Sequence, residues 1–208
     1  DMRAFYASDV VGRVLQALES TGQLDNTLIL YTSDHAALLG DYNCFGKRSM
    51  HNACARVPLL ARLPGRFPAG QVCAQPASLV DVMPTVLAAA GADCHTHALD
   101  GEDLAEVAAG RSNREHVFIQ FKRAGNGLYT AMNPRWKYTY SAPDNEEFLF
   151  DRVQDPMESR NHAGAPFYAD ALKQMRAALI AHLRESGADA VEDGQWKVYP
   201  RRELPRNP

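Results

Sequence analysis

Four side chains that could act on an anion lie between positions 34 and 51. Asp34 and His35 are adjacent, and Lys47 and His51 follow in a segment without regular hydropathy. A carboxylate and an imidazole are both metal ligands, but together they fill at most half of a coordination shell. An ammonium can pair with an anionic oxygen, and an imidazole can donate a proton near neutral pH. Each residue alone also fits a plain structural interpretation, as a helix cap, a solvated lysine or a surface histidine.

The neighbouring segments predict where these side chains lie. Apolar residues at helical spacing predict an amphipathic helix over 3–20, and the apolar run 27–31 predicts a strand buried on both faces of a parallel sheet. The Asp34-His35 pair follows this strand, and ligands of open α/β sheets bind beyond the carboxyl ends of the strands. In residues 36–56 the apolar residues recur at neither helical nor strand spacing, which indicates a long loop. A long loop in a compact domain is usually functional.

Beyond the loop, a short strand is expected over 57–62 and a helix over 81–90, with Asp81 as its cap and Gly91 at its end. The pattern then changes to short strand-like runs separated by turn residues, which favours hairpins and an antiparallel sheet. These runs are 116–121, 128–132, 136–140 and 147–150. A last amphipathic helix is expected over 166–185.

These patterns predict an α/β protein with two layers of organisation. Residues 1–110 are expected to form part of an α/β domain with a mainly parallel sheet. Residues 111–187 are expected to form a small subdomain, in which a helix packs on a four-stranded antiparallel sheet. Residues 188–208 carry charges that cancel, and we interpret them as a surface tail.

Composition excludes several classes of protein. Of 208 residues, 46% are hydrophobic and 23% charged, which is typical of a globular protein and argues against disorder. The net charge of -3 gives no basic field, so nucleic acid is not an expected partner, and no apolar run is long enough for a membrane span. The cysteines, which lack a CxxC pair, favour buried or free thiols over a zinc site and leave disulfides open for an exported protein. They are Cys44, Cys54, Cys73 and Cys94.

An ordered series of motifs extends through most of the chain. It comprises LILYTSDH at 28–35, LGD at 39–41, GK at 46–47, RVPL at 56–59, VDVMPTVL at 80–87, DG at 100–101, WKY at 136–138, EFLFD at 147–151 and DPME at 155–158. The series resembles the second signature region, the following helix and the carboxyl-terminal subdomain of the sulfatases in the alkaline phosphatase superfamily. The resemblance covers residues 3–185.

The resemblance implies roles for three of the four candidate residues, and the chemistry of imidazole suggests one for the fourth. Asp34 and His35 match two ligands of a divalent metal, usually calcium, and Lys47 matches the lysine that contacts the sulfate. His51, in the same loop, is the candidate proton donor, so Lys47 and His51 are the predicted catalytic residues. In this family the nucleophile is a formylglycine made within a C/S-x-P-x-R motif, which none of the four cysteines fits. We therefore expect the formylglycine in a missing amino-terminal part. The helical pattern starts almost at Asp1, and we interpret this start as the point where a longer protein has been cut.

The implied function is that of a fragment of a metal-dependent sulfuric ester hydrolase. Its expected partners are a sulfated small molecule or sugar and the missing amino-terminal half of the same protein, and the isolated segment is predicted to be inactive. Two alternatives stay open: a phosphonate or phosphate ester hydrolase of the same superfamily, and a non-catalytic sulfatase-like binding module. Ala36 replaces a common glycine, and His51-Asn52 replaces a frequent aromatic and acidic pair, which leaves the specificity open. The compartment, periplasmic or secreted versus cytoplasmic, is also open.

Overall fold

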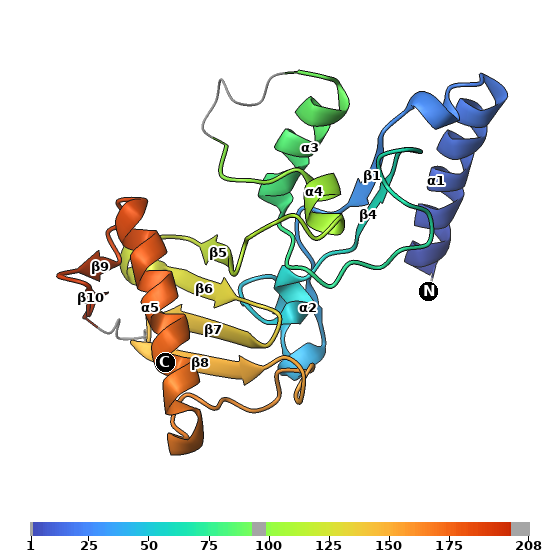
Figure 1. The fold of residues 1–208 in the computed structure, drawn as a ribbon. Coiled ribbons are helices and arrows are strands. Elements are labelled where there is room, and N and C mark those ends of the chain that lie inside the picture. The colour runs from blue at the N-terminus through green and yellow to red at the C-terminus, as the bar shows by residue number, and fades with distance from the viewer. Residues whose placement is uncertain (1, 93–98, 201–208) are drawn as a thin grey trace. The chain divides into compact units, whose positions relative to one another are not determined.

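The computed structural model describes residues 2–92 and 99–200, with side chains from Ser8 onward (Figure 1). The α-helices are α1 (Met2–Ser20), α2 (Asn52–Ala55), α3 (Val82–Ala89), α4 (Leu104–Ala108) and α5 (Ala169–Glu185). The strands are β1 (Ile29–Thr32), β2 (Leu38–Leu39), β3 (Phe45–Gly46), β4 (Leu59–Arg62), β5 (Val117–Phe121), β6 (Leu128–Met132), β7 (Trp136–Ser141), β8 (Glu146–Asp151), β9 (Val191–Glu192) and β10 (Gln195–Trp196). Short 3₁₀ turns are η1 (Leu24–Asn26), η2 (Asp41–Asn43), η3 (Leu79–Asp81), η4 (Ala124–Asn126) and η5 (Pro166–Tyr168). Within the described ranges, no helix is long and apolar enough to cross a membrane.

The chain divides into two compact units, and each is described by itself. Unit 1 comprises Asp1–Ser33, Pro58–Cys73 and Leu79–Arg111. Unit 2 comprises Asp34–Val57, Ala74–Ser78 and Ser112–Pro208. The loop that carries the four candidate residues thus packs with unit 2, whereas the sequence division at residue 110 assigns it to the first domain.

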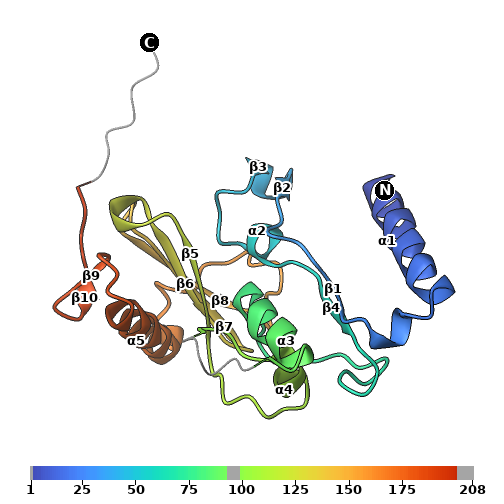
Figure 2. The same cartoon turned by 90° about the horizontal axis from the view of Figure 1, so that it is seen from above.

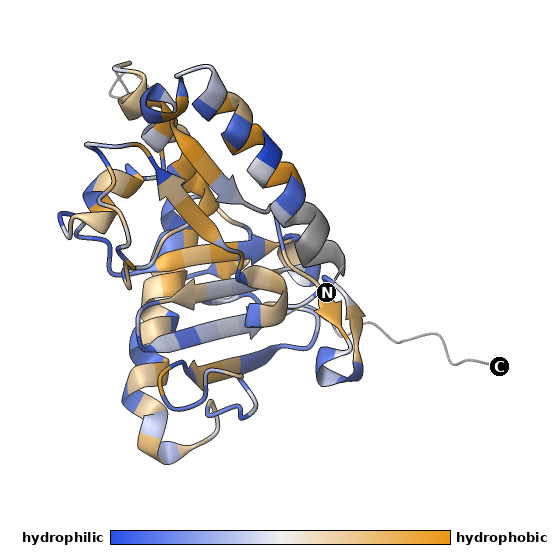
Figure 3. Ribbon diagram, turned by 90° about the vertical axis from the view of Figure 1, so that its right-hand side faces the viewer, coloured by the Kyte–Doolittle hydropathy of each residue, from blue (hydrophilic) through white to orange (hydrophobic). Residues whose placement is uncertain are grey.

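Unit 1 contains the first predicted helix and strand. α1 has the expected amphipathic sequence, with hydrophilic and hydrophobic residues alternating along it (Figure 3). β1 pairs antiparallel with β4, and this pair forms a two-stranded sheet. Parallel neighbours of β1 are not found among the described residues. Tyr31 lies opposite Leu60 on one face of this sheet, where the two side chains are 39% and 58% exposed. The burial predicted for both faces of this strand is therefore not seen in the described part of the chain.

The helix predicted over 81–90 is present as α3, but the role predicted for Asp81 is wrong. Its side chain makes no capping hydrogen bond, is fully buried, and accepts a hydrogen bond at Oδ1 from the Glu102 N–H (2.9 Å). One turn later, Thr85 Oγ1 accepts from the Leu104 N–H at the start of α4 (2.8 Å). Buried polar groups need such partners, so both side chains fix the segment before α4 to α3.

Unit 2 is built on a four-stranded antiparallel sheet in the order β5-β6-β7-β8. The pairs are connected in sequence, with Val117 opposite Met132, Leu128 opposite Ser141, and Trp136 opposite Asp151. The four strand-like runs predicted from the sequence are therefore confirmed. The expected last helix is also present, as η5 followed by α5.

α5 covers one face of this sheet (Figure 2). Its buried residues Met175, Leu179 and Leu183 recur every four positions and are 1–3% exposed. They pack into one cluster with Tyr138 and Leu149 of the sheet, which are fully buried. Complete burial of one large apolar side chain contributes roughly 1.5–3 kcal/mol, so this stripe is the main attachment of α5 to the sheet.

The described part of the predicted tail, through Pro200, packs against the same sheet. β9 and β10 form a small hairpin, in which Trp196 stacks on Tyr140 with ring centroids 4.1 Å apart. The indole N–H donates to the Tyr138 hydroxyl (2.8 Å), and the Tyr199 hydroxyl donates to the Asp189 carbonyl (2.6 Å). Residues 188–200 are thus part of the subdomain and not a free extension.

The described cysteines are thiols. Cys54 is buried, and Cys44 and Cys73 are exposed, in agreement with the expectation of buried or free thiols. Cys94 lies outside the described residues.

Candidate active site

The loop between β1 and β4 has more regular structure than its sequence predicts. β2 and β3 form a hairpin, which is followed by the single helical turn α2. Gly46 at the end of β3 has a φ of 106°, a conformation that is strained for residues with a Cβ atom, and Lys47 follows it directly. The Ala36 N–H donates to the Cys54 carbonyl (2.9 Å), which joins the two ends of the loop. These contacts hold the segment after His35 and the segment around Lys47 in one folded loop.

Three of the four candidate side chains meet in this loop. His35 Nε2 lies 3.3 Å from Asp34 Oδ2 and 2.5 Å from Lys47 Nζ. The Asp34 side chain is 82% exposed and that of His35 is 40% exposed, so the cluster is open to solvent. An acidic oxygen, an imidazole nitrogen and an ammonium therefore converge at one point on the surface of unit 2.

The hydrogen bonds of His35 define which nitrogen can bind a cation. Its Nδ1 lies 2.9 Å from the Ala36 carbonyl oxygen, and a carbonyl can only accept. The proton is therefore on Nδ1, and Nε2 carries the acceptor lone pair of the neutral ring, as in most metal-binding histidines. Nε2 faces both Asp34 and the Lys47 ammonium. Lys47 and a metal ion would thus compete for the same lone pair.

The donor atoms fit part of a divalent cation site. Two ligands that each lie about 2.4 Å from one ion, at right angles, are roughly 3.4 Å apart, and the observed separation of Asp34 Oδ2 and His35 Nε2 is 3.3 Å. Calcium takes about six to eight ligands, mostly oxygens. Residues 2–92 and 99–200 contain no group of three or more His, Cys, Asp or Glu side chains that could hold a metal. The described chain therefore offers two ligands, and a complete shell needs donors from elsewhere.

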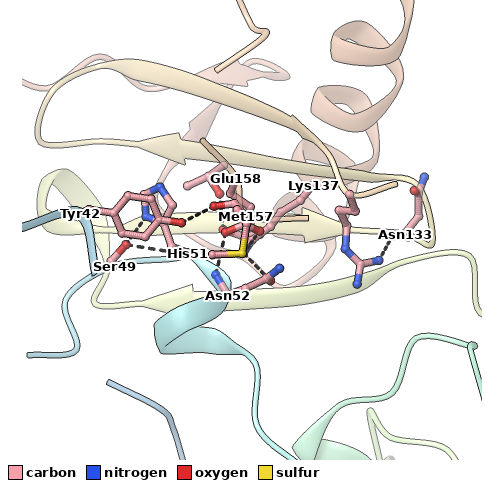
Figure 4. Close-up of polar contacts among 11 residues, drawn as sticks. Tyr42, Ser49, His51, Asn52, Asn133, Lys137, Met157 and Glu158 are labelled. Atoms are coloured by element: carbon pink, nitrogen blue, oxygen red, sulfur yellow. Dashed lines mark hydrogen bonds and ion pairs between the residues drawn. The ribbon is translucent and has the colours of Figure 1, made fainter. Parts of the chain in front are cut away.

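His51 lies in different surroundings, directly before α2. Its Nδ1 is 2.5 Å from Ser49 Oγ, and its ring centroid lies 4.4 Å from that of Tyr42 (Figure 4). The ring centroid of Phe150 is 5.5 Å away. These contacts hold His51 against Tyr42, in the turn between β2 and β3, and against β8. They are a separate set from the contacts that join Lys47 to His35.

Burial changes the protonation of this imidazole. It lowers the pKa of His51 below the ordinary histidine value; the Glu158 carboxylate opposes this effect and the Lys137 ammonium adds to it. The ring is therefore mostly neutral at neutral pH. At that pH only the minor imidazolium form can donate a proton, so His51 is less available as an acid than its predicted role implies.

Two charged residues that sequence reasoning did not select lie beside His51. Lys137 Nζ and Glu158 Oε1 form an ion pair (2.8 Å), and the two side chains are 1% and 0% exposed. Burial lowers the pKa of Lys137, and the Glu158 carboxylate counteracts this effect. One signal was available in the sequence: Lys137 stands between two aromatic residues, Trp136 and Tyr138, in a predicted strand. The structure buries residues on both faces of this strand. Its partner, 21 residues later, could not be identified from local pattern.

Comparison with known proteins identifies the family. Residues 3–92 match the family model described as Sulfatase. The chain is 33% identical over 210 residues to a choline-sulfatase of Rhizobium meliloti (strain 1021), an alignment that covers 93% of the chain and 40% of the relative. The chain belongs to the sulfatase family. It spans about 40% of the length of the curated relatives it matches.

Solved structures confirm the fold class. BT4656, solved in complex with its substrate D-glucosamine-2-N,6-O-disulfate, is similar with a TM-score of 0.74 and 29% identity, over 85% of this chain and 38% of that one. The phosphonate monoester hydrolase SpPMH of Silicibacter pomeroyi is similar with a TM-score of 0.74 and 27% identity, over 93% and 42% of the two chains. The mixed α/β, alkaline-phosphatase-like architecture expected from the sequence is therefore confirmed.

Proposed function

We propose that this chain forms the carboxyl-terminal part of a metal-dependent sulfuric ester hydrolase that acts on a sulfated small molecule or sugar. Membership of the sulfatase family supports the reaction class, and the choline-sulfatase relative and the BT4656 complex support the substrate class. The coverage of about 40% of the relatives supports a further, amino-terminal part as the partner of this chain. The formylglycine nucleophile and the remaining metal ligands would belong to that part.

One observation carries the proposal: the Lys47 ammonium lies 2.5 Å from His35 Nε2, beside the Asp34 carboxylate. This contact orders two exposed side chains and costs them rotamer entropy, which a solvated lysine without a role would avoid. An exposed cationic group beside two metal ligands is suited to an ion that carries negative charge on several oxygens, as a sulfate ester does.

The candidate residues of this chain would have different roles in the reaction. Asp34 and His35 would hold a divalent cation, most simply calcium, which when bound stabilises negative charge on the sulfate oxygens. Lys47 would turn its ammonium from Nε2 to a sulfate oxygen and stabilise the charge that develops in the transition state. His51 would donate a proton to the leaving alkoxide oxygen from its minor imidazolium form and become the neutral imidazole. The chain alone would supply electrostatic stabilisation without a nucleophile and would be inactive.

The test uses the protein extended by its amino-terminal region. Hydrolysis of a sulfated sugar, choline sulfate and a phosphonate monoester is measured for the wild type, Lys47→Met and Lys173→Met, the last as a control for an exposed lysine on α5. We expect sulfate ester hydrolysis that falls about 100-fold or more in kcat/KM in Lys47→Met and is unchanged in the control. No turnover of any sulfate ester by the wild type would overturn the proposal.

A phosphonate or phosphate ester hydrolase is the second candidate, and the similarity to the SpPMH structure favours it. The two functions differ in the nucleophile and in the relative rates on the two ester classes. Faster turnover of the phosphonate monoester than of either sulfate ester would select this candidate. A protein that binds the sulfated ligands without hydrolysing them would instead be a non-catalytic sulfatase-like module.

A further inference from the structure

A buried ion pair in the carboxyl-terminal subdomain holds the residue next to His51. Lys137 comes from β7, and Glu158 follows β8; their charged groups are 2.8 Å apart and inaccessible to solvent. Glu158 Oε2 accepts a hydrogen bond from the Asn52 N–H (2.7 Å), and Lys137 Nζ donates a second one to Asn52 Oδ1 (3.1 Å). Both charges are thus directed at one residue of the loop (Figure 4).

A further hydrogen bond connects the loop to the residue before Glu158. The Tyr42 hydroxyl donates to the carbonyl of Met157, the neighbour of Glu158, at 2.5 Å. Tyr42 also contacts the His51 ring. His51 is therefore held from both directions along the chain: by Asn52, its immediate neighbour, and by the side chain of Tyr42. The hydrogen bonds from Asn52 and Tyr42 are accepted by the adjacent residues Glu158 and Met157.

We propose that Lys137 and Glu158 are positioning residues that fix the His51 imidazole through Asn52. The inference rests on the proposed function only for the role of His51 in turnover. The structural half of it, that the pair orders this part of the loop, stands without any assumption about the substrate.

The chemistry of the pair favours positioning over simple stabilisation. Taking two charges out of water costs several kcal/mol per ion, and an apolar pair of similar volume often stabilises a fold as well or better. A glutamine at 158 could not replace the carboxylate, because one of its two terminal atoms donates and cannot accept from the Asn52 N–H or from Lys137. A carboxylate can accept hydrogen bonds from the Lys137 ammonium and from the Asn52 N–H at the same time, and Asn52 belongs to the loop.

The test measures the position of His51 in the 208-residue chain by NMR. The ring protons of His51 feel ring currents from Tyr42 and Phe150, so their chemical shifts report how the imidazole is held. The first variant replaces both charges by apolar side chains, Lys137→Met with Glu158→Met. We expect the His51 shifts to move to values of an exposed histidine and exchange of the Asn52 amide hydrogen to accelerate about tenfold or more.

A second variant leaves the buried pair intact. Asn52→Pro removes the N–H and Oδ1 that the pair binds, and proline is tolerated in the first turn of a helix. His51 has φ -60° and ψ 153°, the extended conformation that a following proline requires, so the variant is compatible with the local backbone. We expect the same change in the His51 shifts in a folded chain, with a melting temperature a few degrees lower because the buried pair loses its hydrogen bonds to Asn52.

The matched control is the partly exposed ion pair of the same subdomain, whose side chains Arg176 and Glu147 are 37% and 25% exposed. Its replacement by Arg176→Met with Glu147→Gln should leave the His51 shifts unchanged. Wild-type His51 shifts in Asn52→Pro would overturn the inference, and so would wild-type shifts and Asn52 exchange in a folded double variant. The proposed function fails separately, if the extended protein hydrolyses no sulfate ester while the NMR changes occur as expected.

Discussion

Replacement of Lys47 by methionine should strengthen calcium binding to this chain. The Lys47 ammonium lies 2.5 Å from His35 Nε2, the nitrogen whose lone pair faces the Asp34 carboxylate. An incoming cation must displace this ammonium and then remain close to its positive charge. Methionine keeps most of the length of the side chain and removes both the competitor and the repulsion. The same change should weaken sulfate binding, because the group that pairs with the anion is lost.

The size of the effect follows from the geometry. An ion bound to Nε2 would lie about 4 Å from the lysine nitrogen, and a double and a single charge at that distance repel by about 2 kcal/mol in water. The water value is the appropriate one, because the Asp34 and His35 side chains are 82% and 40% exposed. Salt and rotation of the lysine reduce the repulsion. The expected gain is therefore about 1–2 kcal/mol, or a five- to thirtyfold lower Kd for calcium.

Isothermal titration calorimetry of the 208-residue chain with calcium chloride measures this change. The wild type should bind weakly, since it offers two ligands. Lys47→Arg keeps the charge and should bind as weakly as the wild type, and Lys173→Met controls for the loss of one exposed positive charge elsewhere. Equal or weaker calcium binding by Lys47→Met would refute the competition between the ammonium and the ion. Tight binding by the wild type would refute the two-ligand site itself.

Three further predictions concern stability. Burial alone would raise the pKa of Glu147, but hydrogen bonds from Arg176 and a tyrosine hydroxyl outweigh it and leave the pKa below its ordinary value. The stabilisation by this pair is therefore present above the ordinary glutamate pKa and is lost as the pH falls below it. In urea unfolding, Glu147→Gln should have a lower free energy of unfolding than the wild type at pH 7, and the difference should be smaller at about pH 3. Leu179→Ala should lower the free energy of unfolding by about 2–5 kcal/mol, measured by the same titration, because the side chain is 1% exposed. Gly127→Ala places a Cβ 2.3 Å from the buried Tyr129 ring, and should lower the melting temperature by several degrees, a loss of about 1–3 kcal/mol.

Local features of the fold could be predicted from the sequence. The strand-like runs between 116 and 150 match β5 to β8, because turn residues and alternating side chains specify hairpins between neighbouring segments. The last helix was also predictable, since its apolar residues repeat at helical spacing. The antiparallel partner of β1 was not, because β4 lies 30 positions further on and the apolar run gives no strand direction.

The candidate site was predictable only in part. The closeness of Asp34 and His35 to Lys47 followed from the resemblance to the sulfatases, while their roles stay predictions. Lys137 and Glu158 were overlooked because charged residues are almost always exposed, and their burial depends on each other across 21 positions of sequence. Asp81 was assigned to a helix cap by its position, but its acceptor atom serves a backbone N–H far along the chain. Long-range hydrogen bonds of this kind leave no periodic signal.

The link between Asn52 and Glu158 has a consequence for the order of folding. It closes a separation of 106 residues, and the bond from Tyr42 to Met157 closes one of 115. During synthesis, the loop with Lys47 and His51 leaves the ribosome long before the segment that fastens it. The loop can therefore reach its final form only after β8 and the following turn have emerged, and polypeptides that stop short of residue 158 would present this loop unfastened.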